Sequence, residues 1–291
     1  MLRRLMRQGN TSLVVSLPID WTRTKGLTGG NQVEVVCNKD RVMIFPKNEL
    51  DYSKKHILNV EHMDELTLYI NLLNLYRKGF DEIKIKSKSG EISDYETNKK
   101  IDIFASIRKW LPRFIGWEIT KQDPIVIKDL TGESLSDPQK LLNRIFFLLN
   151  CFVDEGIAAA NKKGSMPNPD EFYTTTFKLI NFAIRTYNKQ SGDLGNFLLL
   201  HHLHHIAQQL RDIQPFLKDN KTIITSVFKL LRPALNLSSK NQLSSFIEIH
   251  YKTGLKLNRL KLDNNLFRIL LQLHRSFQEL AYSTNFINLD I

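Results

Sequence analysis

The sequence predicts an α+β protein of several domains, and three observations indicate this fold class. Short strand-like runs separated by turn residues fill the beginning of the chain, and strands alternate with helices in its middle. Long helical patterns of apolar residues fill the remainder. Because 291 residues exceed what one hydrophobic core usually supports, we expect three domains, at 1–48, 54–130 and 134–285.

The first domain is predicted to contain four strands and one short helix. The strands are Leu2–Arg7, Leu13–Leu17, Gln32–Cys37 and Arg41–Phe45. Pro18 suits the first turn of a helix that Gly26 ends, because glycine readily adopts the left-handed conformation of a C-cap. A unit of about 46 residues without a metal or a disulfide buries too little apolar surface to be stable alone. We therefore expect a second copy of the chain to complete the core, which makes the protein a homodimer.

The second domain is predicted to be a small α/β unit with the element order βαβαββ. Its strands are His56–Val60, Glu82–Lys86, Trp117–Thr120 and Ile125–Lys128, and its helices are Asp64–Lys78 and Ser93–Trp110. Leu66, Ile70 and Leu73 recur at helical spacing and should cover the sheet. Gly79 should cap the helix that contains them.

The third domain is predicted to be an all-α bundle of six helices. Apolar residues repeat every three or four positions within long segments, and breaker residues separate these segments. The predicted helices cover 138–162, 169–189, 193–214, 221–236, 241–261 and 264–283. Such helices must pack against one another to bury their apolar faces.

Composition excludes several classes of protein. Cys37 and Cys151 form no CxxC pair, so they indicate neither a disulfide scaffold nor a cysteine-rich zinc site. No apolar run is long enough to cross a membrane, and the N-terminus lacks an export signal, so we expect a cytoplasmic protein. The phosphate-loop, zinc-protease and nucleophile-elbow motifs of enzymes are missing. We therefore expect no enzymatic activity and no cofactor.

Positive charge is concentrated at the beginning of the chain. The net charge is +11, and the first fifty residues hold 8 basic against 4 acidic residues. Arg3, Arg4 and Arg7 all precede the first acid, Asp20. Guanidinium groups bind phosphate oxygens or guanine edges through two hydrogen bonds, so this segment favours double-stranded DNA as a partner. The alternative is an ordinary solvated surface whose charges protect exposed strand edges. Further hydroxyl, amide and basic groups that would contact DNA are those of Asn10, Thr11, Ser12, Arg23 and Lys25.

The segment Gln8–Pro18, together with Trp21, Gly26–Leu27 and Gly30–Val33, resembles the AbrB/SpoVT/MazE-type DNA-binding domain. The resemblance implies a swapped-hairpin β-barrel that two chains form together, in which basic residues of the early strands and loop contact DNA. The residues that fall where this family places its DNA-facing groups are Arg3, Arg4, Arg7, Asn10, Thr11, Ser12, Arg23 and Lys25.

The rest of the chain resembles the archaeal phosphate-uptake regulators, which join this DNA-binding domain to a PhoU-like helical domain. Segments 66–70, 76–83 and 115–119 carry the resemblance in the middle domain, and the helical part agrees in its pattern. The resemblance implies a six-helix PhoU-like domain at the C-terminal end and a role in phosphate homeostasis.

The sequence departs from the PhoU-like pattern at its metal motif. His204 and Gln208 stand where the Glu-x-x-x-Asp motif that binds metal clusters is found. Because neither residue offers a carboxylate oxygen, we predict no metal at this position. The neighbouring His201 and His205 lie four apart and are the residues that would chelate an ion, but the sequence identifies no third ligand. The alternative is that these histidines are packed or face solvent.

Together these observations predict a homodimeric DNA-binding transcription regulator linked to phosphate uptake, whose helical domain is a sensor or docks a protein partner. Two alternatives remain open. One is a signalling adaptor that docks on a transporter or kinase, with the first domain as a dimerisation clamp. The other is an architectural, chromatin-type protein that binds DNA of any sequence. Salt dependence of DNA binding tests the first alternative, and competition between duplexes tests the second.

Overall fold

The computed structural model describes most of the chain. The described residues are 2–9, 11–37, 42–46, 54–94, 96–131, 138–161, 168–190, 194–216, 220–222, 224–225, 228, 251–252, 254–255, 257 and 264–288. The predicted helices at 221–236 and 241–261 fall largely outside these ranges. The chain divides into two compact units, unit 1 (Met1–Lys54) and unit 2 (Lys55–Ile291).

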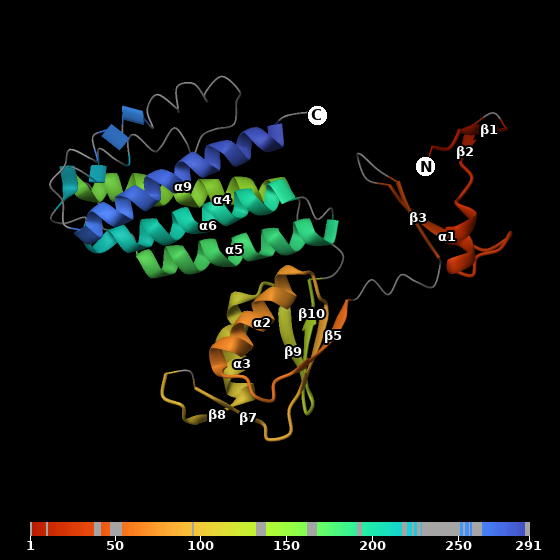
Figure 1. The fold of residues 1–291 in the computed structure, drawn as a ribbon, viewed down its shortest axis with the longest axis horizontal. Coiled ribbons are helices and arrows are strands. Elements are labelled where there is room, and N and C mark those ends of the chain that lie inside the picture. Colours follow the sequence, from red (N-terminus) through yellow and green to blue (C-terminus); the bar gives the residue numbers. More distant parts are fainter. Residues whose placement is uncertain are drawn as a thin grey trace. The chain divides into compact units, whose positions relative to one another are not determined.

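Unit 1 contains two antiparallel hairpins and one short helix (Figure 1). Strand β1 (Met6–Gln8) pairs with β2 (Ser12–Val14), and β3 (Val33–Cys37) pairs with β4 (Val42–Pro46). Helix α1 (Ile19–Thr24) lies between the two hairpins in sequence.

Helix α1 begins and ends as predicted. Pro18 is its N-cap and Lys25 its C-cap. Gly26 has a φ of +63°, a backbone conformation that residues with a Cβ rarely adopt. This turn lets the backbone N–H of Leu27 donate to the carbonyl oxygen of Thr22 at 2.8 Å. The glycine is therefore the left-handed cap that the sequence indicated.

The prediction of a β-barrel is wrong for the single chain. Within the described residues of unit 1, the four strands form two separate two-stranded sheets, and neither sheet closes. The strands are also shorter than predicted, since β1 begins at Met6 rather than Leu2 and β2 ends at Val14 rather than Leu17. Each three-residue strand has only its hairpin partner to pair with, so the ladder ends where the partner ends.

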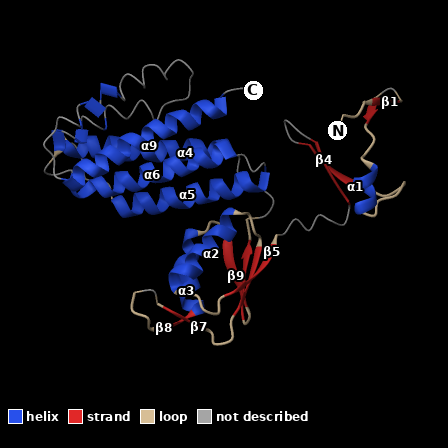
Figure 2. Ribbon diagram, viewed as in Figure 1, coloured by secondary structure: helices blue, strands red, loops and turns tan. Residues whose placement is uncertain are grey.

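Unit 2 begins with a four-stranded mixed sheet in the order β5-β6-β10-β9. The strands are β5 (Lys55–Asn59), β6 (Glu82–Lys86), β9 (Trp117–Gln122) and β10 (Ile125–Asp129). β5 runs parallel to β6, whereas β10 is antiparallel to both β6 and β9. Helices α2 (Glu65–Arg77) and α3 (Ile103–Trp110) cover one face of this sheet (Figure 2).

The predicted buried face of α2 is wrong. Leu66 and Ile70 are 40% and 46% exposed. The residues that α2 buries are Glu65, Leu68, Leu72, Leu75 and Tyr76. Leucine, isoleucine and tyrosine occupy positions around the whole helix, so helical spacing alone fits either face. Gly79, with a φ of +82°, caps this helix as predicted.

The predicted helix at 93–110 is correct only in its second half. Strand β7 (Glu91–Ser93) and strand β8 (Lys100–Asp102) form a hairpin that precedes α3. The Asp94 carboxylate accepts the backbone N–H of Thr97 at 2.6 Å, which closes a turn in place of a helix. Asp102 then accepts the backbone N–H of Ala105 at 2.7 Å and caps α3.

Four long helices of unit 2 pack as a bundle and confirm the corresponding predicted helices (Figure 1). They are α4 (Pro138–Ala160), α5 (Pro169–Gln190), α6 (Leu194–Ile213) and α9 (Asn264–Asn288). Short 3-10 turns, η1 (Leu111–Arg113) and η2 (Gln214–Phe216), follow α3 and α6. A connected cluster of buried apolar residues runs from the sheet into the bundle, so the two parts of unit 2 share one core.

Candidate nucleic-acid interface

The β1–β2 hairpin brings three of the predicted DNA-contacting residues together. Arg7 lies on β1 opposite Leu13. Ser12 is the first residue of β2, and Thr11 precedes it in the turn. All three side chains that would contact DNA, those of Arg7, Thr11 and Ser12, are exposed. Asn10, the fourth residue predicted at this hairpin, lies outside the described residues.

Two more predicted arginines precede the hairpin. Arg3 and Arg4 are exposed and lie in the segment that leads into β1. Among the described residues, no ion pair involves Arg3, Arg4 or Arg7. Their positive charge is therefore available to an external anion.

Arg23 and Lys25 lie on a second element of unit 1. Arg23 is in the last turn of α1, and Lys25 is its C-cap. Both side chains are exposed. Basic residues at this end of a helix also interact favourably with the helix dipole, so their position has a local structural reason as well as a role in the predicted interface.

Many apolar side chains of unit 1 are exposed. Among the residues of unit 1 whose burial is described, which leaves out Val36 and Met43, Pro46 alone is buried. Leu2, Leu5 and Leu13 are 100%, 66% and 66% exposed. Other exposed apolar residues of the unit are Met6, Val15, Ile19, Val35 and Val42. The apolar residues of intermediate exposure are Val14, Leu17, Trp21, Leu27, Val33, Ile44 and Phe45. Small apolar surfaces are common on proteins, but a unit of this size whose described apolar residues are exposed or only partly buried has little core to hold its fold.

A buried charge cluster that sequence reasoning missed joins the sheet of unit 2 to the bundle. Arg185, in the C-terminal third of α5, has a side chain that is only 1% exposed. Its Nη1 donates to the carbonyl oxygens of Tyr76 at 2.9 Å and of Phe80 at 2.8 Å. Its Nη2 donates to Oδ1 of Asp81 at 3.1 Å and to Oδ2 of Asp129 at 2.5 Å.

Lys189 completes this cluster one turn later on α5. Its Nζ donates to the same two carboxylates, those of Asp81 and Asp129. Two cations thus balance two carboxylates, and we call Arg185, Lys189, Asp81 and Asp129 the Arg185 cluster. Buried charges are tolerated when they are paired and hydrogen-bonded, as all four are here. The cluster holds α5 against the ends of α2 and β10.

We expect unit 2 to lose stability in acid because Asp129 becomes protonated. Burial raises the pKa of Asp129, but hydrogen bonds from Thr131 and Arg185 and the charge of Arg185 outweigh it and lower the pKa from 3.8 to about 2. Because the folded-state pKa is the lower one, ionised Asp129 stabilises the fold above about pH 4, and this contribution disappears as the pH falls toward about 2. We expect the free energy of unfolding of the wild type to fall by about 2 kcal/mol relative to Asp129→Asn over that range. Urea denaturation at each pH measures it, and a constant difference would contradict the assignment.

The histidine-rich segment lies on α6. The Nε2 atoms of His201 and His205 are 3.1 Å apart. Nε2 of His204 is 3.0 Å from the Tyr173 hydroxyl, and burial together with the charge of Arg77 lowers the pKa of His204 to about 4. His204 is therefore a neutral, half-buried partner of Tyr173. It does not fit the carboxylate-bound metal cluster of the PhoU-like motif, and no group of three metal-binding side chains occurs among the described residues.

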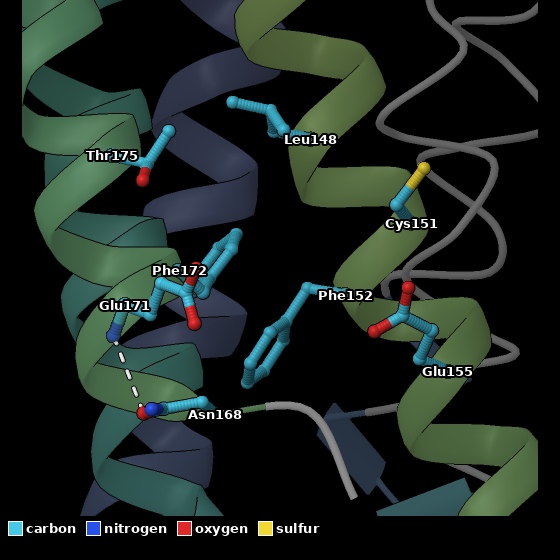
Figure 3. Close-up of a pocket in the computed structure, with 8 residues that line it drawn as sticks. All are labelled: Leu148, Cys151, Phe152, Glu155, Asn168, Glu171, Phe172 and Thr175. Atoms are coloured by element: carbon cyan, nitrogen blue, oxygen red, sulfur yellow. Dashed lines mark hydrogen bonds between the residues drawn. The ribbon is translucent and has the colours of Figure 1, made fainter. Parts of the chain in front are cut away.

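A pocket of about 320 Å³ opens between α4 and α5 (Figure 3). The stacked rings of Phe152 and Phe172, with centroids 4.0 Å apart, line it. The carboxylates of Glu155 and Glu171 also line it. Burial raises the pKa of the neighbouring Cys151 thiol, so the thiol is protonated at neutral pH and is a poor nucleophile.

Comparison with known proteins finds no family model, no curated protein and no solved structure that matches this chain. Among the helices of the described ranges, none combines the length and apolar character needed to cross a membrane.

Proposed function

We propose that the chain is a homodimeric transcription regulator whose unit 1 binds double-stranded DNA. The observation that carries this proposal is the pairing of two properties in one small unit. Arg3, Arg4 and Arg7 are exposed without an acidic partner in the described residues, and the apolar side chains beside them are uncovered. The first property suits a polyanion, and the second requires another protein surface.

A second copy of the chain is the partner that best satisfies this requirement. Identical hairpins that interleave would cover the leucines of both copies and extend the short β1–β2 ladder, as in the swapped-hairpin barrel that the sequence resemblance implies. The same pairing would place two sets of arginines on one assembly. A two-fold arrangement of this kind matches the symmetry of duplex DNA, which presents equivalent backbones to both halves.

We propose that unit 2 receives the signal that controls DNA binding. The resemblance to archaeal phosphate-uptake regulators suggests phosphate homeostasis as the regulated process and the helical bundle as a sensor or a docking site for a protein partner. Its shared core and the Arg185 cluster make the sheet and the bundle one body, so a ligand or protein that binds the helices would act on the sheet as well.

The test is binding of the full-length chain to duplexes of several different sequences at increasing salt, with the mass of the free protein measured by sedimentation. We expect a dimer, and we expect its affinity to fall steeply with salt. Six phosphate contacts, three from each chain, give a log–log slope of about −5. A monomer that ignores the duplex at low salt would contradict the proposal. A dimer that does not bind DNA would favour the signalling adaptor. Equal affinity for duplexes of every sequence would favour the architectural DNA-binding protein.

A further inference from the structure

Two of the four histidines on α6 are positioned as a pair. The Nε2 atoms of His201 and His205 lie 3.1 Å apart, so one imidazole donates to the other. The two other histidines contact different groups. His204 lies against the Tyr173 hydroxyl, and Nδ1 of His202 lies 3.2 Å from a carboxylate oxygen of Glu279 on α9. His201 and His205 thus form a separate pair within the segment.

The separation within this pair equals the bite of two ligands on one metal ion. A metal–nitrogen bond of about 2.1 Å with a ligand angle of about 100° places two imidazole nitrogens about 3.2 Å apart. The helix fixes this spacing, because residues four apart lie above one another on the same face. The ring of Phe197, one turn earlier, is nearly parallel to that of His201, with an interplanar angle of 11°.

The geometry points to a binding site for a divalent late transition-metal ion, Zn²⁺, Ni²⁺ or Cu²⁺, chelated by Nε2 of His201 and Nε2 of His205. Imidazole nitrogen suits these ions, whereas Mg²⁺ and Ca²⁺ prefer oxygen. To bind, the donating imidazole moves its proton from Nε2 to Nδ1, and rotation of the two rings, which are perpendicular in this structure, turns both Nε2 lone pairs toward the ion. The exposed position of His201 leaves the remaining coordination positions to water.

The site is independent of the proposed DNA interface, because both ligands belong to unit 2. The histidine site also differs from a carboxylate-bound metal cluster, because imidazole nitrogens and carboxylate oxygens prefer different metal ions. An ion that is held by only two protein ligands exchanges readily with solution, so the occupancy of the site follows the ion's concentration.

The test is calorimetric titration of the tag-free, full-length protein with Zn²⁺ in excess Mg²⁺. We expect one Zn²⁺ per chain in the wild type. His201→Ala and His205→Ala should each weaken binding about tenfold or more, because one of two ligand bonds is lost. The matched control is His202→Ala, which removes a neighbouring imidazole outside the pair and should bind within about twofold of the wild type.

Cu²⁺ paramagnetic resonance provides a readout that does not depend on affinity. The spectrum of the wild type should show coupling to two imidazole nitrogens, and that of His201→Gln or His205→Gln to one. Circular dichroism confirms that each variant is folded. Equal Zn²⁺ binding by all variants, or a Cu²⁺ spectrum unchanged by either substitution, would overturn the proposal.

Discussion

Replacing Arg3, Arg4 and Arg7 together with alanine is expected to weaken binding to duplex DNA by about a hundredfold or more at moderate salt. Each arginine is exposed and has no acidic partner within the described residues, so its charge is available to a phosphate. A dimer would lack six such groups. The slope of log affinity against log salt should become shallower by about 0.9 for every phosphate that the variant no longer neutralises. Fluorescence anisotropy with a labelled duplex measures both quantities.

A matched control separates these arginines from the effect of net charge. Arg144, Arg268 and Arg275 are exposed arginines of unit 2. Replacing all three with alanine removes the same charge from each chain but leaves unit 1 intact. This variant should keep the salt slope of the wild type. If both triple variants bound DNA equally weakly, the arginines of unit 1 would act only through the overall charge of the protein.

Replacing Arg185 with methionine is expected to lower the free energy of unfolding of unit 2 by about 3–5 kcal/mol. The substitution leaves the carboxylates of Asp81 and Asp129 with Lys189 as their remaining cation in the Arg185 cluster. It also removes the donor to the carbonyl oxygens of Tyr76 and Phe80. Unpaired buried groups cost more than the original bonds contribute. Urea denaturation followed by circular dichroism at 222 nm measures the change.

Two further variants test the physical reason for this destabilisation. Arg144→Met changes an exposed arginine on α4 in the same way and should alter stability by less than about 0.5 kcal/mol. Asp129→Asn added to Arg185→Met removes one of the two carboxylates and should recover part of the stability. If Arg185→Met cost less than about 1 kcal/mol, water would have replaced the guanidinium, and the cluster would not hold the sheet to the bundle.

Local signals predicted the helices whose ends are marked by particular residues. Pro18 and Gly26 mark the two ends of α1, and Gly79 marks the end of α2. The helix predicted at 93–110 failed at its first half because the Asp94 carboxylate stabilises a turn there, an interaction that the apolar spacing of the segment does not reveal.

Interactions between distant residues explain most of what the sequence did not predict. Arg185 meets Asp81 and Asp129 across 104 and 56 positions of the chain, and no short motif links them. One signal was available, because Arg185 directly follows the apolar run Phe182–Ile184 within a helix, and a charge at such a position requires a buried partner. The barrel failed for a different reason, since the four strands of unit 1 form two separate two-stranded sheets in the single chain, and the proposed barrel takes its second half from another chain.

The uncovered apolar residues of unit 1 tie its activity to abundance. In the proposed homodimer each competent assembly would use two chains, so in the dilute limit the number of assemblies would follow the square of the chain concentration. Halving synthesis would then reduce occupied operators about fourfold at low occupancy. If the proposed function holds, gene dosage would itself be a steep input to repression or activation, before any effector reached the helices.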